Sequence, residues 1–258
     1  MTQIALRVQH TSLQFSDSPR QQEHDVTKIF VEGEKYPIKT GTEAGPVDVG
    51  KGGGGKNNRE LILEFAERFN HVVNFGGDSW VAVDKAIIHP RTLERGDLFL
   101  VSNDKMVGHG SDRIMPWLGF DHIDPRVGRI YQGAVHYPTK GATKGSPNYA
   151  VNVECSIKIG QWLTQVAAGQ NLGFVNGDFN MNDKILDVAL GQRFTTMADE
   201  LNRHQNTGHG PIDGMCSYDK DGRVHAHRFN VLDDSEFRLF SDHYMCRGTW
   251  KIDALKEA

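Results

Sequence analysis

The sequence predicts an α/β protein in which strands outnumber helices and most neighbouring strands run antiparallel. Short runs with apolar residues at alternate positions recur along the chain, whereas helical spacing is confined to a few segments. The gaps between many successive strands are too short to hold crossover helices. We therefore expect mostly antiparallel sheets whose outer faces are covered by a few helices.

Strands are expected wherever apolar residues alternate with polar ones. Helices are expected where apolar residues repeat every three or four positions, and Asn57 and Asn58 are plausible caps for the first of them. The predicted strands are 4–8, 72–75, 80–83, 98–101, 130–136, 172–179 and 244–252, and the predicted helices are 61–69, 156–168 and 183–201. Residues 103–128 contain Trp117 and Phe120 and are expected to form a long irregular insertion, which either carries recognition or is held to the core by its aromatic rings.

The composition is that of a soluble globular protein, with 258 residues, 38% hydrophobic and 24% charged residues, and a net charge of -4. The longest apolar runs fall well short of the roughly 18 residues that span a bilayer, and the first residues lack the stages of a secretory signal. Three scattered cysteines do not suggest a disulfide framework. We expect residues 1–258 to form one intracellular domain, a monomer with no membrane partner.

The stretch Leu-Gly-Phe-Val-Asn-Gly-Asp-Phe-Asn holds the most informative pair of polar residues. An apolar strand there ends in Asp178 and Asn180, two positions apart, so both side chains lie on one face. A carboxylate beside an amide can orient a water molecule and hold a phosphate oxygen. Taken alone, Gly-Asp-Phe-Asn is also typical of a turn.

A second polar cluster begins the last predicted strand, where Ser241, Asp242 and His243 are consecutive. Neighbours on a strand point to opposite faces, so these three residues are not expected to form a hydrolase triad among themselves. Asp242 is instead expected to bind a cation and His243 to face a phosphate group. Asp213 follows Ile212 at what reads as another strand edge, and such a carboxylate can fix the tautomer of a histidine.

The order of these motifs resembles the endonuclease/exonuclease/phosphatase superfamily, which includes DNase I and exonuclease III. The resemblance spans nearly the whole chain and rests on a Glu after an early strand, a mid-chain His, Gly-Asp-x-Asn, Ile-Asp and Ser-Asp-His. It implies a four-layer α/β sandwich of two sheets packed face to face with helices outside. In this sequence the motifs supply Glu43, His136, Asp178, Asn180, Asp213, Asp242 and His243.

The resemblance also implies divalent-metal-dependent hydrolysis of a phosphodiester, giving 5′-phosphate and 3′-hydroxyl ends. Glu43 and Asp242 would hold Mg²⁺ or Mn²⁺, Asp178 would deprotonate the attacking water, and Asn180 would hold both water and phosphate. His243, oriented by Asp213, and His136 would contact the phosphate from two sides. Where the family has an Asn on the first strand this chain has Ser12, which either binds the metal, directly or through water, or leaves that place to His10 or Thr11.

Nucleic acid is the expected partner, with DNA favoured over RNA. A basic stretch inside the acidic chain carries five cationic residues against the single acidic Glu154, and such a stretch can bind a phosphate backbone or simply be a solvated strand edge. A small or lipid phosphoester remains an alternative substrate. The five cationic residues are Arg126, Arg129, Lys140, Lys144 and Lys158.

Three other functions are weaker alternatives. Gly50–Asn57 matches a phosphate-binding G-x-x-x-x-G-K loop but ends in Asn57 instead of Ser or Thr, and no buried strand precedes it. Cys216, His225, His227 and Cys246 have a spacing that is not typical of zinc sites. A domain of this fold that has lost its activity and serves as a binding module is the third alternative.

Overall fold

The computed structural model describes residues 2–13, 19–44, 58–108, 111–181, 195–196, 213–232, 243 and 245–256. Asp242 and the glycine-rich segment 50–56 lie outside these ranges, so the predictions made for them are not addressed by the structure. Within the described residues, no helix is both long enough and apolar enough to cross a membrane.

The strands form two six-stranded sheets. The first sheet has the order β11 (Val224–Leu232), β12 (Met245–Asp253), β1 (Gln3–Ser12), β2 (Ile38–Thr42), β4 (Ser79–Asp84), β3 (His71–Gly76). The second sheet has the order β5 (Glu94–Val101), β6 (Arg113–Asp121), β7 (Arg129–His136), β8 (Leu172–Asp178), β10 (Asp213–Tyr218), β9 (Thr195–Thr196).

Two of the strand pairs are parallel, β1 with β2 and β7 with β8, and each is joined by a crossover helix. The crossovers are α1 (Pro19–Val31) and α3 (Tyr149–Val166), and a further helix, α2 (Asn58–Arg68), precedes β3. Every other pairing between described strands is antiparallel. The expectation of mostly antiparallel sheets is therefore confirmed.

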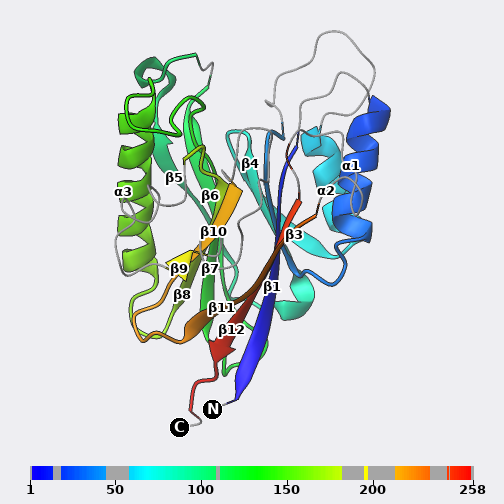
Figure 1. The fold of residues 1–258 in the computed structure, drawn as a ribbon. Helices are drawn as coiled ribbons and strands as arrows, with labels where there is room; N and C mark the ends of the chain where they lie inside the picture. Colours follow the sequence, from blue (N-terminus) through cyan, green and yellow to red (C-terminus); the bar gives the residue numbers. More distant parts are fainter. Residues whose placement is uncertain are drawn as a thin grey trace.

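The molecule has four layers, with the two sheets face to face and helices on both outer faces (Figure 1). Helix α3 covers the second sheet, while α1 and α2 lie together on the outer side of the first sheet. Short one-turn helices, Lys85–Ile87 and Asn103–Lys105, complete the described elements. This arrangement is the predicted four-layer α/β sandwich.

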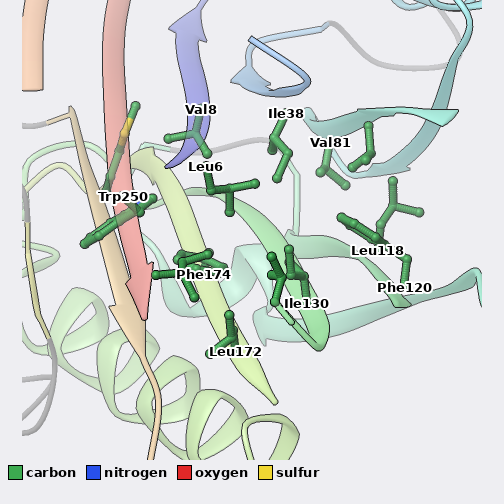
Figure 2. Close-up of a cluster of buried hydrophobic side chains, with 14 of the residues drawn as sticks. Leu6, Val8, Ile38, Val81, Leu118, Phe120, Ile130, Leu172, Phe174 and Trp250 are labelled. Carbon is green, nitrogen blue, oxygen red and sulfur yellow. The ribbon is translucent and has the colours of Figure 1, made fainter. Parts of the chain in front are cut away.

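The central core lies between the two sheets, and alternate residues of both sheets fill it. Each large aliphatic side chain buried there stabilises the fold by roughly 1.5 to 3 kcal/mol relative to an exposed one. Figure 2 shows this core, in which the first sheet contributes Leu6, Val8, Ile38, Val81 and Trp250 and the second contributes Leu118, Phe120, Ile130, Leu172 and Phe174.

The inward face of several strands changes from apolar to polar toward one end of the sandwich. In β8, Leu172 and Phe174 belong to the central core, and Asp178 lies on the same face because side chains alternate along a strand. In β7 the same face runs from Ile130 to His136. The polar ends of these strands meet at one edge of the sandwich, and this edge is the candidate site.

Several elements differ from the sequence prediction. Helix α1 and the strands β2 and β11 are absent from the predicted ranges. Residues 113–121, expected within an irregular insertion, form strand β6 inside the second sheet, and Phe120 is fully buried in the central core. Both faces of β6 are covered, so its apolar residues do not alternate with polar ones, and Pro116 is unusual within a strand. The predicted helix 183–201 is wrong at Thr195–Thr196, which pair with β10 as β9, while its other residues lie outside the described ranges.

Candidate active site

Asp178 lies at the centre of the site because three neighbouring strands end beside it. The strand register pairs it with His136 at the end of β7 on one side and with Asp213 at the start of β10 on the other. Asp178 is 2% exposed, and its Oδ2 lies 3.7 Å from His136 Nε2 and 3.9 Å from His243 Nε2. A single buried carboxylate is thus placed between two imidazole rings.

Each of these two histidines has its own aspartate. His243 Nδ1 lies 2.8 Å from Asp213 Oδ2, and His136 Nδ1 lies 2.7 Å from Asp78 Oδ2. Both rings therefore turn their Nε2 atoms toward Asp178. A carboxylate that accepts from Nδ1 fixes the orientation and tautomer of an imidazole.

Asp78 reaches His136 because it occupies the tight turn between β3 and β4. Gly76 pairs with Ser79, so Gly77 and Asp78 form a two-residue loop, and Gly77 has the positive φ of 59° that such turns favour. Arg113, which begins β6, donates from Nη1 to Asp78 Oδ2 at 2.7 Å and is 5% exposed. The Asp78 carboxylate therefore joins a guanidinium to an imidazole.

Glu43 and Asn180 both have left-handed backbone conformations, with φ of 58° and 44°. Such conformations are costly for residues other than glycine and tend to occur at functional sites. Two hydrogen bonds fix Asn180 in place. Its backbone N–H donates to Asp178 Oδ1 at 2.9 Å, and its Nδ2 donates to Tyr137 O at 3.0 Å. Glu43 directly follows β2, as expected, and its Oε1 lies 4.0 Å from His136 Nε2.

Burial and neighbouring charges move the pKa values of the site in different directions. Burial, together with repulsion from Asp213, raises the pKa of Asp178 to about 6. Burial would also raise the pKa of Asp213, but attraction and a hydrogen bond from His243 hold it well below its ordinary value. The two neighbouring carboxylates are therefore unequal, and Asp178 binds a proton more readily than Asp213.

Asp78 and His136 each stabilise the charged form of the other. Burial alone would raise the pKa of Asp78, but attraction and a hydrogen bond from His136, with a further contribution from Arg113, bring it well below its usual value. Burial would lower the pKa of His136, but attraction to Asp78 raises it overall. The imidazole of His136 therefore holds a proton more readily than an ordinary histidine does.

The site has features that suit a divalent cation and a phosphate group. His136 Nε2 is buried and has no hydrogen-bond partner among the described residues, and its distances to the carboxylates of Asp178 and Glu43 are too long for direct hydrogen bonds. Carboxylate oxygens are the ligands that Mg²⁺ and Mn²⁺ prefer. Asp178, Asp213 and His243 also offer three possible ligand atoms that lie within 4.8 Å of one another.

The structure gathers most of the predicted site residues at this one edge. Asp242 lies outside the described residues, so its role as a metal ligand stays a prediction. Ser12 is at the edge as well, where its Oγ donates to Asp213 Oδ1 at 3.2 Å. The other residues brought together there are Glu43, His136, Asp178, Asn180, Asp213 and His243.

Neither Asp78 nor Arg113 was predicted as a site residue from the sequence. The Gly-Gly-Asp-Ser turn between two predicted strands was the available signal for Asp78, because a tight turn at the site end of a sheet brings its side chains to the edge. Arg113 fell within the segment expected to be irregular. His10, an alternative to Ser12, has its Nε2 3.7 Å from Asp213 Oδ1, whereas Thr11 lies on the opposite face of β1.

The proposed zinc ligands do not form a cluster. Cys216 is buried between the second sheet and α3, whereas Cys246 is buried between the two sheets. His225 is engaged with Asp253, whose Oδ2 lies 3.0 Å from its Nε2. In the described part of the chain the structure therefore gives no support to a zinc site.

Much of the predicted basic stretch is neutralised locally. Arg129 contacts Glu94 and Asp121, and Arg126 forms an ion pair with Asp124 at 2.7 Å. Lys158 lies 3.5 Å from Glu154. The two remaining cations, Lys140 and Lys144, are exposed on the loop that follows His136.

No family model matches the sequence, and no curated protein matches it. Among solved structures, an endonuclease/exonuclease/phosphatase family protein from Bacteroides thetaiotaomicron superposes with a TM-score of 0.69 at 14% identity, covering 98% of this chain and 100% of that one. TDP2 from D. rerio, in a complex with a single-strand DNA product, gives a TM-score of 0.68 at 11% identity, covering 95% and 98% of the two chains.

ANGEL2, described as a 2′,3′-cyclic phosphatase and bound to adenosine-2′,3′-vanadate, gives a TM-score of 0.65 at 9% identity. That match covers 97% of this chain and 96% of the other. These superpositions show that the architecture is shared. At identities this low they do not show a shared chemistry, which has to be argued from the site residues. The chain has the fold of the endonuclease/exonuclease/phosphatase proteins, and the resemblance that its motifs indicated is confirmed at that level.

Proposed function

We propose that the protein is a divalent-metal-dependent phosphodiesterase whose preferred substrate is DNA. One observation carries the proposal: the buried carboxylate of Asp178 lies between two histidines, each of which is held by its own aspartate. A base placed between two oriented imidazoles provides a proton acceptor for water and donors on both sides of a phosphate group.

Asp178 is the residue that orients and deprotonates the attacking water. A carboxylate with a pKa of about 6 is mostly ionised at neutral pH, yet it accepts a proton more readily than an exposed carboxylate does. The N–H of Asn180 holds its Oδ1, which leaves Oδ2 facing the two histidines. Asn180 is proposed to hold the water and the phosphate.

His136 and His243 contact the non-bridging phosphate oxygens from opposite sides. His136 is suited to this role because its pKa is raised and its buried Nε2 lacks a hydrogen-bond partner among the described residues. Asp213 orients His243 in the same way that Asp78 orients His136. Donors fixed in advance stabilise charge that develops on the phosphate without having to reorganise.

Glu43 and Asp242 are proposed to hold the Mg²⁺ or Mn²⁺ ion. When bound, the metal would neutralise charge that develops on the phosphate oxygens. Glu43 suits this role because its carboxylate is a third exposed at the mouth of the site, 4.0 Å from His136. Asp213 and His243 are less available as ligands, because they are bonded to each other and Asp213 also accepts from Ser12.

The substrate assignment follows from the phosphate chemistry and the surroundings of the site. Water forms a bond to phosphorus, the bond from phosphorus to the 3′ oxygen breaks, and the departing oxygen takes up a proton. The products would be a 5′-phosphate and a 3′-hydroxyl. The DNA product bound to TDP2 and the adenosine ligand of ANGEL2 support a nucleic-acid or nucleotide substrate, as do the exposed lysines near His136.

A substrate panel tests this function. Supercoiled plasmid, linear duplex, single-stranded DNA, RNA and bis(p-nitrophenyl) phosphate would each be incubated with Mg²⁺, with Mn²⁺ and with EDTA. We expect metal-dependent cleavage of DNA, and nicks that DNA ligase reseals directly because they carry a 5′-phosphate and a 3′-hydroxyl. Asp178→Asn should abolish this activity, whereas Asp221→Asn, an exposed carboxylate in the turn at the far end of β10, should retain it.

The outcomes separate the alternatives. Cleavage of the small ester alone would assign the site to small or lipid phosphoesters instead of DNA. Hydrolysis that persists in EDTA would overturn the metal requirement. No hydrolysis of any ester with either metal would indicate a binding module that has lost its activity.

A further inference from the structure

The carboxylate of Asp213 is held by two side-chain pairs that cross between β1 and β2. The parallel register places Ser12 opposite Thr42 and His10 opposite Thr40. All four side chains are at most 1% exposed, and they lie on the inward faces of their strands. On the same faces, nearer the middle of the sandwich, β1 and β2 carry the apolar residues Leu6, Val8 and Ile38. The four residues at the edge are polar instead.

A directed chain of hydrogen bonds runs through the outer pair. Thr42 Oγ1 donates to Ser12 Oγ at 2.8 Å, and Ser12 Oγ donates to Asp213 Oδ1 at 3.2 Å. The other carboxylate oxygen, Asp213 Oδ2, lies 2.8 Å from His243 Nδ1. The inner pair repeats the contact more loosely, with His10 Nδ1 3.0 Å from Thr40 Oγ1 and His10 Nε2 3.7 Å from Asp213 Oδ1.

We infer that Ser12 and Thr42 are positioning residues that hold Asp213 for His243, and that Ser12 is not a metal ligand. The inference rests on the proposed function, in which His243 contacts the phosphate. A hydroxyl has one proton, and that of Ser12 is directed at the carboxylate of Asp213 while its oxygen accepts from Thr42. A neutral hydroxyl is also a weaker ligand for a hard cation than the carboxylate of Glu43.

The direction of these bonds explains how the first strand acts on the histidine. A carboxylate can rotate about its last bond, and a donor on Oδ1 limits this rotation so that Oδ2 stays in line with Nδ1 of the imidazole. Partners that orient a catalytic histidine or a metal ligand are commonly required for full activity. Ser12 therefore acts through Asp213 without touching the substrate.

Kinetics and metal binding together test the inference. In Ser12→Ala we expect kcat to fall about tenfold, as for the loss of a hydrogen bond to a charged group, with little change in KM. Ser12→Thr keeps a hydroxyl and should restore much of the lost rate. Mn²⁺ affinity, measured by calorimetry, should stay within about twofold of wild type in Ser12→Ala. Glu43→Gln should weaken it at least tenfold.

Matched variants separate this effect from general damage to the core. Thr42→Val keeps the size of the side chain and removes only the donor to Ser12, so kcat should fall by about two- to threefold. Thr11→Val changes a neighbouring buried hydroxyl on the opposite face of β1, which has no partner among the described residues, and should leave kcat unchanged. Equal losses in Thr42→Val and Thr11→Val would overturn the inference.

A readout without turnover keeps the inference separate from the proposed function. In the metal-free protein, the Nδ1 proton of His243 should give a downfield proton NMR signal that disappears in His243→Ala and shifts in Ser12→Ala. If the wild type hydrolyses no ester, this signal and the Mn²⁺ titration still test the hydrogen-bond chain. The inference is wrong if Ser12→Ala weakens Mn²⁺ binding as Glu43→Gln does, or leaves the His243 signal unchanged.

Discussion

Two parts of the molecule bury ionisable side chains, but they pair them differently. Beneath α1, on the outer face of the first sheet, Lys39 Nζ lies 3.1 Å from His71 Nε2, so two basic groups are neighbours. At the edge of the sandwich, Asp78 and Asp213 are each bonded to a histidine, so groups of opposite charge are neighbours. Lys39, His71, His136 and Asp213 are all buried.

The basic pair responds to burial by losing protons. Burial lowers the pKa of Lys39 to about 8, and attraction to Asp84 and Glu34 offsets this only in part. Burial, together with the charge of Lys39, lowers the pKa of His71 to about 4. His71 Nδ1 donates to Phe69 O, which leaves Nε2 to accept from Lys39. The pair lies against the ring of Phe30 in α1, where burying its charge costs stability.

The acidic partners at the edge reverse the effect of burial. The pKa of Asp78 stays well below its ordinary value and that of His136 is raised, so both groups favour their charged forms. Burial by itself therefore does not mark a functional site in this fold. The edge differs because its buried groups keep their charges. In addition, the Nε2 atoms of His136 and His243 both face one atom, Asp178 Oδ2.

The largest effect on stability is expected from removing the buried lysine. The unfolded chain binds a proton at Lys39 up to pH 10.5, but the folded chain only up to about pH 8. The free energy of unfolding should therefore be lowest below pH 8 and rise between pH 8 and 10.5, by roughly 2 to 4 kcal/mol from this group. Urea unfolding of wild type and Lys39→Met from pH 7 to pH 10 measures it, and the variant should lose that rise.

Lys35→Met is the control for this experiment because Lys35 is exposed in the turn before β2. Its pH profile should follow that of the wild type. If Lys39→Met also keeps the wild-type rise, the two regions do not differ in the way described above.

A smaller effect is expected from breaking the pair that Asp78 forms with His136. Asp78→Asn keeps the shape of the turn but removes the charge that orients His136 and pairs with Arg113. We expect phosphodiesterase activity to fall about 10- to 100-fold, the usual range for a residue that orients a catalytic group. Single-turnover rates at saturating metal measure it.

Asp124→Asn provides the matched control for this change. Asp124 also pairs with an arginine, at 2.7 Å, but belongs to the β6–β7 connection away from the site. Wild-type rates in Asp78→Asn, or equal losses in the two variants, would remove His136 from the proposed chemistry.

The smallest effect concerns the exposed lysines on the loop after His136. Lys140→Ala combined with Lys144→Ala should raise KM for DNA about three- to tenfold and reduce its salt dependence, with kcat nearly unchanged. The matched double variant is Arg126→Ala with Lys158→Ala, two cations that already have acidic partners. If Arg126→Ala with Lys158→Ala raises KM as much as Lys140→Ala with Lys144→Ala does, the attraction of DNA is spread over the whole basic stretch.

The sequence predicts strands with uninterrupted apolar runs better than a strand that contains a proline. The ends of β7 and β8 were located within a residue or two, although both faces of β8 are buried along its whole length. Strand β6 was missed because Met115, Leu118 and Phe120 are all buried and Pro116 lies between them. Because β8 is also covered on both faces, the feature that separates β6 from it is Pro116, a residue that rarely occurs inside a strand.

The site was predicted in part for a related reason. Asp178, Asp213 and His243 lie in motifs whose order along the chain is informative, so their proximity was expected and is observed. Asp78 belongs to no such motif, and its contact with His136 depends on where the hairpin of β3 and β4 lies against β7. Contacts between two sheets are set by three-dimensional packing, which spacing along one chain does not encode.

The most direct test of the central claim is a double-mutant cycle between Asp178 and His243. Asp178→Asn and His243→Ala should each lower the hydrolysis rate by on the order of 10² to 10⁴, and the double variant should be little worse than the poorer single variant, because the two residues act as one unit. Folding should be retained, since neutralising Asp178 relieves its repulsion with Asp213. Wild-type activity in Asp178→Asn, or losses that multiply in the double variant, would contradict a single site built around Asp178.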